Sequence, residues 1–288
     1  MKKGAFSAGE TWRRWATLLA IIAAFGVNIW TNIAPINGLT VGDISNTFFV
    51  NTKIIPANYA FSIWGLIYLG LFGLAIYQLL PSQRDNPRLA QMGYGLVSAS
   101  IAQIIWIFLF LYGLFPQSIL AMVAILLSLI YSYVKLDVGR RRVPKWESWL
   151  INIPLSVYLS WISVATVVNV AIALTSINWN GWGIPPQVWT AIMMIVAATI
   201  AIIMRVRHQE TAYLLVTIWA LIAIAIAQDN EPLIVTIALM SSLVICLFSL
   251  GSINHRKLTY EQWIIKLPSP FSQRERAGGG EGGGVKEP

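Results

Sequence analysis

The sequence predicts an all-α membrane protein, an eight-helix polytopic bundle, and three observations lead to this fold class. Of the 288 residues, 57% are hydrophobic and only 11% are charged, whereas soluble domains carry about 25% charged residues. Eight apolar segments are each long enough to cross a hydrocarbon core about 30 Å thick. The Lys and Arg residues alternate between successive connections of these segments. We therefore expect the chain to be integral to a lipid bilayer.

Two features support this number of spans. The closest pairs of segments are joined by tight turns, one around Pro116 and one at residues 229–232. A missing or an additional span would break the alternation of charge between the two sides. The expected spans are 15–33, 57–80, 92–114, 117–135, 148–175, 187–205, 210–228 and 232–254.

The charge distribution also predicts the orientation. Of the 20 Lys and Arg residues, only Lys53 falls in a connection on the side opposite the two termini. Because cytoplasmic loops carry an excess of Lys and Arg, we expect both termini in the cytoplasm. The expected location is a bacterial plasma membrane. The formal net charge of +8 is spread over these short connections, so it does not indicate a nucleic-acid partner.

The sequence offers no candidates for catalysis. No Asp, Glu, Lys, Arg or His falls near the middle of an expected span, which disfavours a proton-coupled carrier. Hydrolysis and group transfer lack a general acid or base, a metal cluster and a glycine-rich phosphate loop. The single cysteine, Cys246, lies in an apolar span and excludes a disulfide framework. We expect no enzyme, no required cofactor and no metal site.

Three of the expected spans carry an aromatic stripe. Residues three and seven positions apart lie on one face of a helix. One such stripe is typical of core packing, but three of them predict an aromatic-lined pocket. The stripes are Phe61, Trp64 and Tyr68 in the second span, Gln103, Trp106 and Phe110 in the third, and Tyr158, Trp161, Ala165 and Asn169 in the fifth.

The longest outer connection, residues 34–56, directly precedes the first stripe. A connection of this length in a compact membrane protein is often a lid, and a solvated connector is the alternative. The other sizeable outer loop carries Trp179 and Trp182, which we expect to anchor the chain at the membrane interface.

The three stripes resemble the motifs of the TspO/MBR family, the tryptophan-rich sensory proteins related to the peripheral benzodiazepine receptor. That family has five membrane helices, and its motifs fall on the second, third and fifth. The resemblance covers about residues 10–175. It divides the chain into a TspO-like five-helix unit (1–175), three additional transmembrane helices (176–257) and a cytoplasmic flexible tail (258–288). The matching residues are Pro56, Tyr59, Phe61, Trp64 and Tyr68, then Gln103, Trp106 and Phe110, then Tyr158, Leu159, Trp161, Ala165 and Asn169.

Several positions depart from the family pattern. Lys53 stands where the family has a tryptophan in the first loop, and Gln103 replaces an asparagine. The remaining departures are Ile55 and Ser62 for prolines, Leu111 for phenylalanine, Val157 for proline and Val164 for phenylalanine.

The resemblance implies a membrane sensor or binding protein for a tetrapyrrole (porphyrin or haem) or a similar flat hydrophobic ligand, held in a cavity that the first loop caps. Some members are reported to degrade porphyrins with the help of tryptophans, but the loss of the loop tryptophan at position 53 argues against such chemistry here. The implied ligand-binding residues are Tyr59, Phe61, Trp64, Tyr68, Gln103, Trp106, Phe110, Tyr158, Trp161, Ala165 and Asn169.

Two other functions stay open. A transporter of a small neutral or amphipathic solute would use the three additional helices and the polar row of Ser156, Ser160 and Ser163, which interhelical packing also explains. The second alternative is a membrane scaffold that binds no ligand. Small residues four apart, at 20 and 24 and at 197 and 201, permit close helix contact or a homodimer without specifying a partner.

Overall fold

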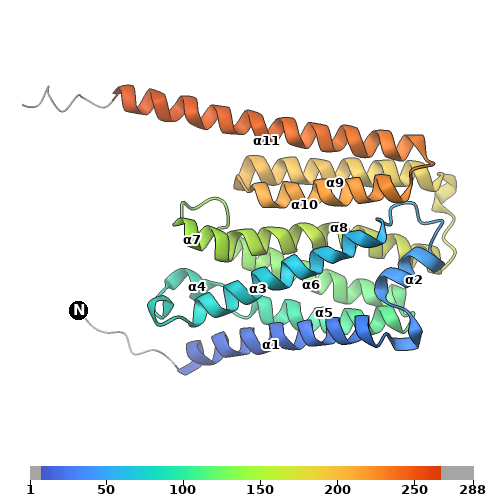
Figure 1. The fold of residues 1–288 in the computed structure, drawn as a ribbon, viewed down its shortest axis with the longest axis horizontal. Coiled ribbons are helices and arrows are strands. Elements are labelled where there is room, and N and C mark those ends of the chain that lie inside the picture. Colours follow the sequence, from blue (N-terminus) through green and yellow to red (C-terminus); the bar gives the residue numbers. More distant parts are fainter. Residues whose placement is uncertain (1–7, 267–288) are drawn as a thin grey trace, which may run out of the picture. The chain divides into compact units, whose positions relative to one another are not determined.

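The computed structural model describes the backbone of residues 8–266 and the side chains of residues 9–249. Within that range the chain is helical throughout and contains no strand (Figure 1). The long helices are α1 (Ala8–Ile33), α3 (Ile63–Leu79), α5 (Gly95–Leu111), α6 (Phe115–Lys135), α8 (Ile153–Ser176), α9 (Pro186–His208), α10 (Thr211–Ala227) and α11 (Pro232–Lys266). The short ones are η1 (Ile36–Gly38), α2 (Val41–Phe48), η2 (Asn58–Ser62), η3 (Pro81–Gln83), α4 (Pro87–Gln91), α7 (Lys145–Glu147), the π-helical turn η4 (Ser148–Asn152) and η5 (Gly181–Gly183).

The apolar helices fall where the sequence predicts spans, which makes the chain an integral membrane protein. In the described part of the chain, six helical segments are long and apolar enough to cross a bilayer. Two more, α5 and α10, are equally apolar but only 17 residues long. Length and composition thus give six spans, and the eight-span arrangement stays a prediction.

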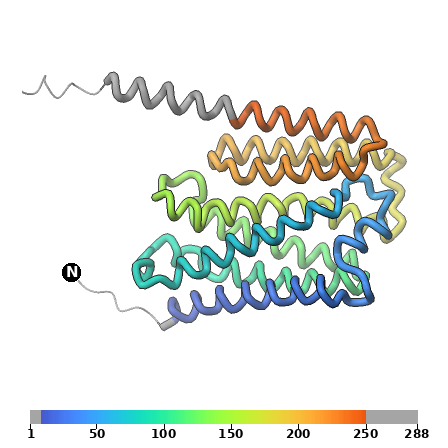
Figure 2. The backbone as a smooth tube through the Cα atoms, viewed as in Figure 1, coloured from blue at the N-terminus to red at the C-terminus, as the bar shows by residue number. Residues whose placement is uncertain are grey.

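Residues Met1–Cys246 form one compact unit, in which successive long helices run in alternating directions (Figures 1 and 2). Helix α8 lies at the centre of this unit, against α3, α6 and α10, while α1 packs on α3 and α5, and α9 on α10. Residues 154–162 of α8 are all buried, as expected for a helix that is apolar on every side. The boundary at residue 175 was placed where the resemblance to the family ends, and it stays a prediction.

The remaining residues, 247–288, form a separate unit. Helix α11 continues to Lys266, beyond residue 257, after which we expected the tail to begin. Residues 267–288 lie outside the described part of the chain, so the predicted flexible tail is not described beyond that point.

Buried arginines close the end of the bundle at which α1 begins. Arg13 and Arg14, which are 3% and 5% exposed, both pair with Glu10. Arg14 also donates to the carbonyl oxygens of Gln78, Gln83 and Arg84. These carbonyls lie at and just beyond the C-terminus of α3, where a cation offsets the helix dipole and satisfies unpaired oxygens.

A second buried arginine holds three further segments at the same end. The Arg88 guanidinium donates to the Leu136 carbonyl, the Asn152 amide oxygen and the Glu147 carboxylate. His208 Nδ1 lies 2.9 Å from the carbonyl oxygen of Val138. The connections that are rich in Lys and Arg therefore meet at one end of the unit, as their charge predicts.

The long outer connection contains a helix, α2, that the sequence analysis missed. Thr40 and Asp43 form a capping box, in which the Asp43 amide donates to Thr40 Oγ1 and Asp43 Oδ2 accepts from the Thr40 amide. Hydrogen bonds from the Thr40 hydroxyl and from the Thr40 amide to Asp43 Oδ2 hold the pKa of the Asp43 carboxyl below its ordinary value. The spacing Thr-x-x-Asp before a helical turn is visible in the sequence and would have predicted this N-terminus.

The loop after α6 packs tightly on the connection between α9 and α10. Gly139 has a φ of +75°, and a Cβ at this position would overlap the carbonyl oxygen of His208. Gly183 has a similar φ of +77°, but nothing lies within 4 Å of its Cβ position. A side chain would therefore meet backbone strain at both positions, but only at position 139 would its Cβ also overlap a neighbouring atom.

We predict that Gly139→Ala lowers the free energy of unfolding by on the order of 3 kcal/mol, because strain and overlap combine. The matched variant Gly183→Ala should lose only about 1 kcal/mol, from strain alone. Thermal unfolding in detergent, followed by circular dichroism, measures both. Equal losses in the two variants would show that the loop after α6 does not rest on the α9–α10 connection.

Glu210 is a buried carboxyl in that same connection, with 9% of the residue exposed. Burial raises the pKa of Glu210 above its ordinary value of 4.5, against the opposing effects of hydrogen bonds from Ser156 and Asn152 and of the charges on Arg205 and Arg88. The protonated form is therefore favoured in the folded protein relative to the unfolded chain.

We predict that Glu210→Gln stabilises the protein at neutral pH. With a raised pKa in the folded state, wild-type stability falls as the pH rises from about 4.5 through the folded pKa. The glutamine variant lacks this fall. Its thermal midpoint should exceed the wild-type value at neutral pH and approach it below that window. A variant less stable than wild type at neutral pH would mean that the charged carboxylate is needed by its arginine neighbours.

Candidate functional site

The predicted site residues meet inside the bundle, and most of their polar atoms bond to one another. Tyr158 of α8 donates to Gln103 Oε1 of α5 at 2.6 Å. Gln103 Nε2 donates to the Tyr68 hydroxyl of α3 at 2.6 Å, and Tyr68 donates to the carbonyl oxygen of Ala24 in α1 at 3.0 Å. This chain of hydrogen bonds joins four helices in a region where no water replaces a lost partner. The ring of Trp64 packs beside this chain, and its centroid lies 6.0 Å from the ring centroids of both Tyr68 and Tyr158.

A second group ties α5, α6 and α8 together. The indole N–H of Trp106 donates to Asn169 Oδ1, and Asn169 Nδ2 donates to Ser118 Oγ at 2.8 Å. Phe110 packs beside Trp106, at 5.3 Å between centroids, and against Phe115 at 5.1 Å. Asn169 is thus fully engaged within the protein. Ser118, which the sequence analysis did not select, supplies its second partner.

Trp161 differs from its neighbours because its polar atom is not satisfied. The residue is 3% exposed, and within the described part of the chain its indole Nε1 has no hydrogen-bond partner. The ring of Phe61 meets the indole edge-on, at 6.1 Å and 82°. An unpaired donor buried in a low-dielectric interior costs roughly 1–3 kcal/mol. Such a donor is therefore a position where an acceptor from outside the protein would be favoured.

The packing around α8 loosens next to Trp161. Residues 163–167 are all partly exposed, directly after the nine buried residues 154–162. Five consecutive residues point to every side of a helix, so this accessible belt is not one lipid-facing stripe. Ala165, one turn beyond Trp161, belongs to it. The belt lies where a ligand bonded to Trp161 would need space.

Residues 49–62, here called the lid segment, lead from the end of the bundle into this region. Phe49 packs edge-on against Phe115, at 5.0 Å, and Thr52 Oγ1 lies 2.9 Å from Thr175 Oγ1 at the end of α8. Further along, the Tyr59 ring meets Trp219 of α10 at 5.1 Å. The segment thus passes from the C-terminal end of α8 to the ring of Trp161, where Phe61 lies.

The structure separates the eleven predicted residues by position. The assignment of any of them as ligand contacts is untested and stays a prediction. Tyr59 lies apart from the rest, 40% exposed and against α10, a helix to which the sequence analysis gave no role. Phe61 meets Trp161, and Ala165 follows Trp161 by one turn of α8. Trp64, Tyr68, Gln103 and Tyr158 form the chain of hydrogen bonds and ring contacts, and Trp106, Phe110 and Asn169 form the second group.

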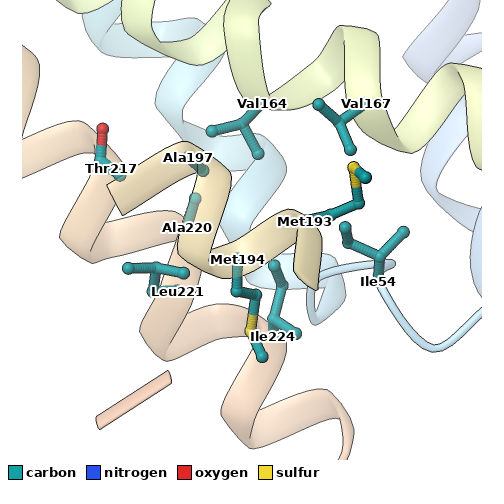
Figure 3. Close-up of a pocket in the computed structure, with 10 residues that line it drawn as sticks. All are labelled: Ile54, Val164, Val167, Met193, Met194, Ala197, Thr217, Ala220, Leu221 and Ile224. Atoms are coloured by element: carbon teal, nitrogen blue, oxygen red, sulfur yellow. The ribbon is translucent and has the colours of Figure 1, made fainter. Parts of the chain in front are cut away.

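A small cavity of about 20 Å³ lies on another side of α8, between α8, α9 and α10. Figure 3 shows Val164 and Val167 reaching from α8 towards Met193 of α9. Ile54 of the lid segment also lines it, and none of its lining residues belongs to the predicted set. A cavity of this size holds about one water-sized molecule, far less than a planar macrocycle. We interpret it as a gap in packing.

The serine row of α8 is engaged in packing. Ser160 donates to the carbonyl oxygen of Tyr213 at 2.8 Å and lies 3.2 Å from Thr217 Oγ1. Ser163 donates to the Leu159 carbonyl one turn back. Hydrogen bonds of this kind between membrane helices are expected from packing alone, so the row does not outline a polar passage.

Two tryptophans of the loop before α9 form a group with a third in the first turn of α9. Trp179, Trp182 and Trp189 lie within 6.0 Å of one another by ring centroids. Trp182 is 76% exposed, as suits a side chain that inserts at a membrane surface. Among the described residues, no group of three His, Cys, Asp or Glu is placed to hold a metal ion.

The arrangement of aromatic residues on α3, α5 and α8 agrees with a comparison of the whole sequence with known families. The family model for TSPO-like protein matches residues 14–251. The chain belongs to the TSPO-like protein family. The match runs past residue 175 and includes α9, α10 and most of the described α11, so the family relationship extends beyond the five-helix unit in which the motifs lie. No curated protein and no solved structure gives a significant match to the chain.

We predict that Gln103→Met destabilises the protein by roughly 1–3 kcal/mol, because Tyr158 loses its acceptor while it remains buried. Adding Tyr158→Phe removes the stranded hydroxyl and should recover most of the loss. Unfolding of the two single variants and the double variant in detergent measures this coupling. Additive losses would contradict the bond between Tyr158 and Gln103.

Proposed function

We propose that this TSPO-like protein binds a flat hydrophobic ligand of the porphyrin or haem kind beneath the lid segment, against Trp161. The observation that carries the proposal is the buried indole N–H of Trp161, which lacks an acceptor in the described part of the chain. A carboxylate oxygen on the edge of the ligand would accept from it. Phe61 and Trp64 would supply aromatic surface for stacking.

The accessible belt supports the same position. Ala165 is small and lies one turn beyond Trp161 on α8, and residues 163–167 are only partly buried. The rings of Phe61 and Trp161 already touch, so a macrocycle needs room that the closed arrangement does not give. We infer that the lid segment moves when the ligand enters, so that η2, which carries Phe61, shifts away from Trp161.

We propose binding, and not catalysis or transport, as the role. The side chains around Trp161 are aromatic, amide or aliphatic and offer no general acid or base with an ordinary pKa near neutrality. The serine row is bonded to α10 and to its own helix, so no observation favours the passage of a solute. We further propose that all eight apolar helices span the membrane, with both termini in the cytoplasm of a bacterial cell, on the basis of the charge distribution.

We predict that Trp161→Phe weakens the binding of protoporphyrin by roughly fivefold to tenfold, because the variant keeps an aromatic ring but loses the donor. The measurement is a titration in detergent followed by the absorbance of the porphyrin. The stability of the empty protein should change little, because relief from the cost of the N–H, which lacks an acceptor among the described residues, offsets the packing that the smaller ring loses.

Trp179→Phe is the matched control, because Trp179 lies in the loop before α9, away from Trp161. The affinity of this variant for protoporphyrin should stay at the wild-type value. Equal affinities for wild type and Trp161→Phe would place the ligand elsewhere. No saturable binding to the wild type would overturn the proposed function itself.

A further inference from the structure

The helices that follow α8 hold the lid segment in place. Lys53 Nζ lies 3.2 Å from Glu231 Oε1, in the connection between α10 and α11. The Ala57 amide donates to the carbonyl oxygen of Ala223 in α10, at 3.0 Å. Both contacts join a segment that precedes α3 to a part of the chain more than 160 positions away.

We propose that Glu231 and α10 form a latch on the lid segment, which sets how often the lid opens and therefore how fast a ligand reaches Trp161. The part of this proposal that concerns ligand entry rests on the proposed function. The latch itself concerns only the lid segment, α10 and the α10–α11 connection.

Glu231 is placed to act on more than one element. Its Oε1 accepts from Gln187 Nε2, at the start of α9, at 3.3 Å, besides pairing with Lys53. The Lys53 and Glu231 side chains are 22% and 26% exposed, so the pair is partly withdrawn from solvent. One carboxylate thus connects the lid segment to α9 and to the start of α11.

The charges at this end of the protein make the pair specific. Lys53 is the only Lys or Arg in the connections on this side. Asp229, the neighbouring carboxylate, is exposed and accepts from Asn230, and Asp43 is engaged in the capping box of α2. Glu231 is therefore the carboxylate that meets Lys53.

Trp219 holds the next part of the lid segment, deeper along α10. Its indole N–H points to the carbonyl oxygen of Ala60 at 3.4 Å, and its ring meets Tyr59 edge-on at 89°. These contacts lie between the ion pair and the Phe61–Trp161 contact. Release of the ion pair would therefore loosen the outer part of the lid first, which makes Glu231 the point at which opening begins.

The experiment measures hydrogen exchange of the lid-segment amides, residues 49–62, in the ligand-free full-length protein. A partly exposed ion pair is worth about 0.5–1 kcal/mol, so Glu231→Gln should speed exchange roughly twofold to fivefold. Asp229→Asn is the matched control and should leave exchange unchanged. The charge-reversed double variant Lys53→Glu with Glu231→Lys should return exchange towards the wild-type rate.

Unchanged exchange in Glu231→Gln, or no recovery in the double variant, would overturn the latch. The rate of protoporphyrin association is then measured on the same proteins and should rise by the same factor as exchange. Faster exchange without porphyrin binding to any variant would leave the latch standing and overturn the proposed function. Faster exchange with an unchanged association rate would overturn the role of the latch in ligand entry.

Discussion

Polar side chains on a helix that lies in hydrocarbon must find partners within the protein, because lipid supplies none, and this constraint organises the bundle around α8. Tyr158 is bonded to α5, Asn169 to α5 and α6, and Ser160 to α10. Each bond fixes the register of α8 against one neighbour. Against this background the unpaired N–H of Trp161 stands out, and it lies where the packing around α8 begins to loosen.

The same region connects the two parts of the chain that the sequence separates. The lid segment brings Phe61 to Trp161, and it is held there from the other side by α10 and by Glu231. The three helices after α8 are thus part of the structure that encloses the site. The family match over residues 14–251 likewise includes α10 and the connection that follows it.

Helix positions and faces could be predicted from the sequence, whereas partners across the bundle could not. Apolar length places the helices, and Trp64 and Tyr68 lie close together on α3, as their spacing predicts. Phe61 falls in the preceding turn η2. Gln103 and Asn169 were expected to face a ligand, but they bond to tyrosine, tryptophan and serine side chains. Those pairings join residues 35 to 63 positions apart, and helical periodicity carries no information on them. Helix α2 was not predicted, although its capping box, Thr40 with Asp43, is visible in the sequence.

The most direct test of the account is the nitrogen-15 resonance of the Trp161 indole in detergent-solubilised protein, identified among the 13 tryptophans by its loss in Trp161→Phe. Without ligand, the Trp161 indole proton should resonate as a group without a hydrogen bond. On addition of protoporphyrin it should move downfield as it gains an acceptor, while the Trp106 indole, already bonded to Asn169, moves little. A hydrogen-bonded Trp161 indole in the empty protein, or a resonance that does not respond to a bound porphyrin, would contradict the account.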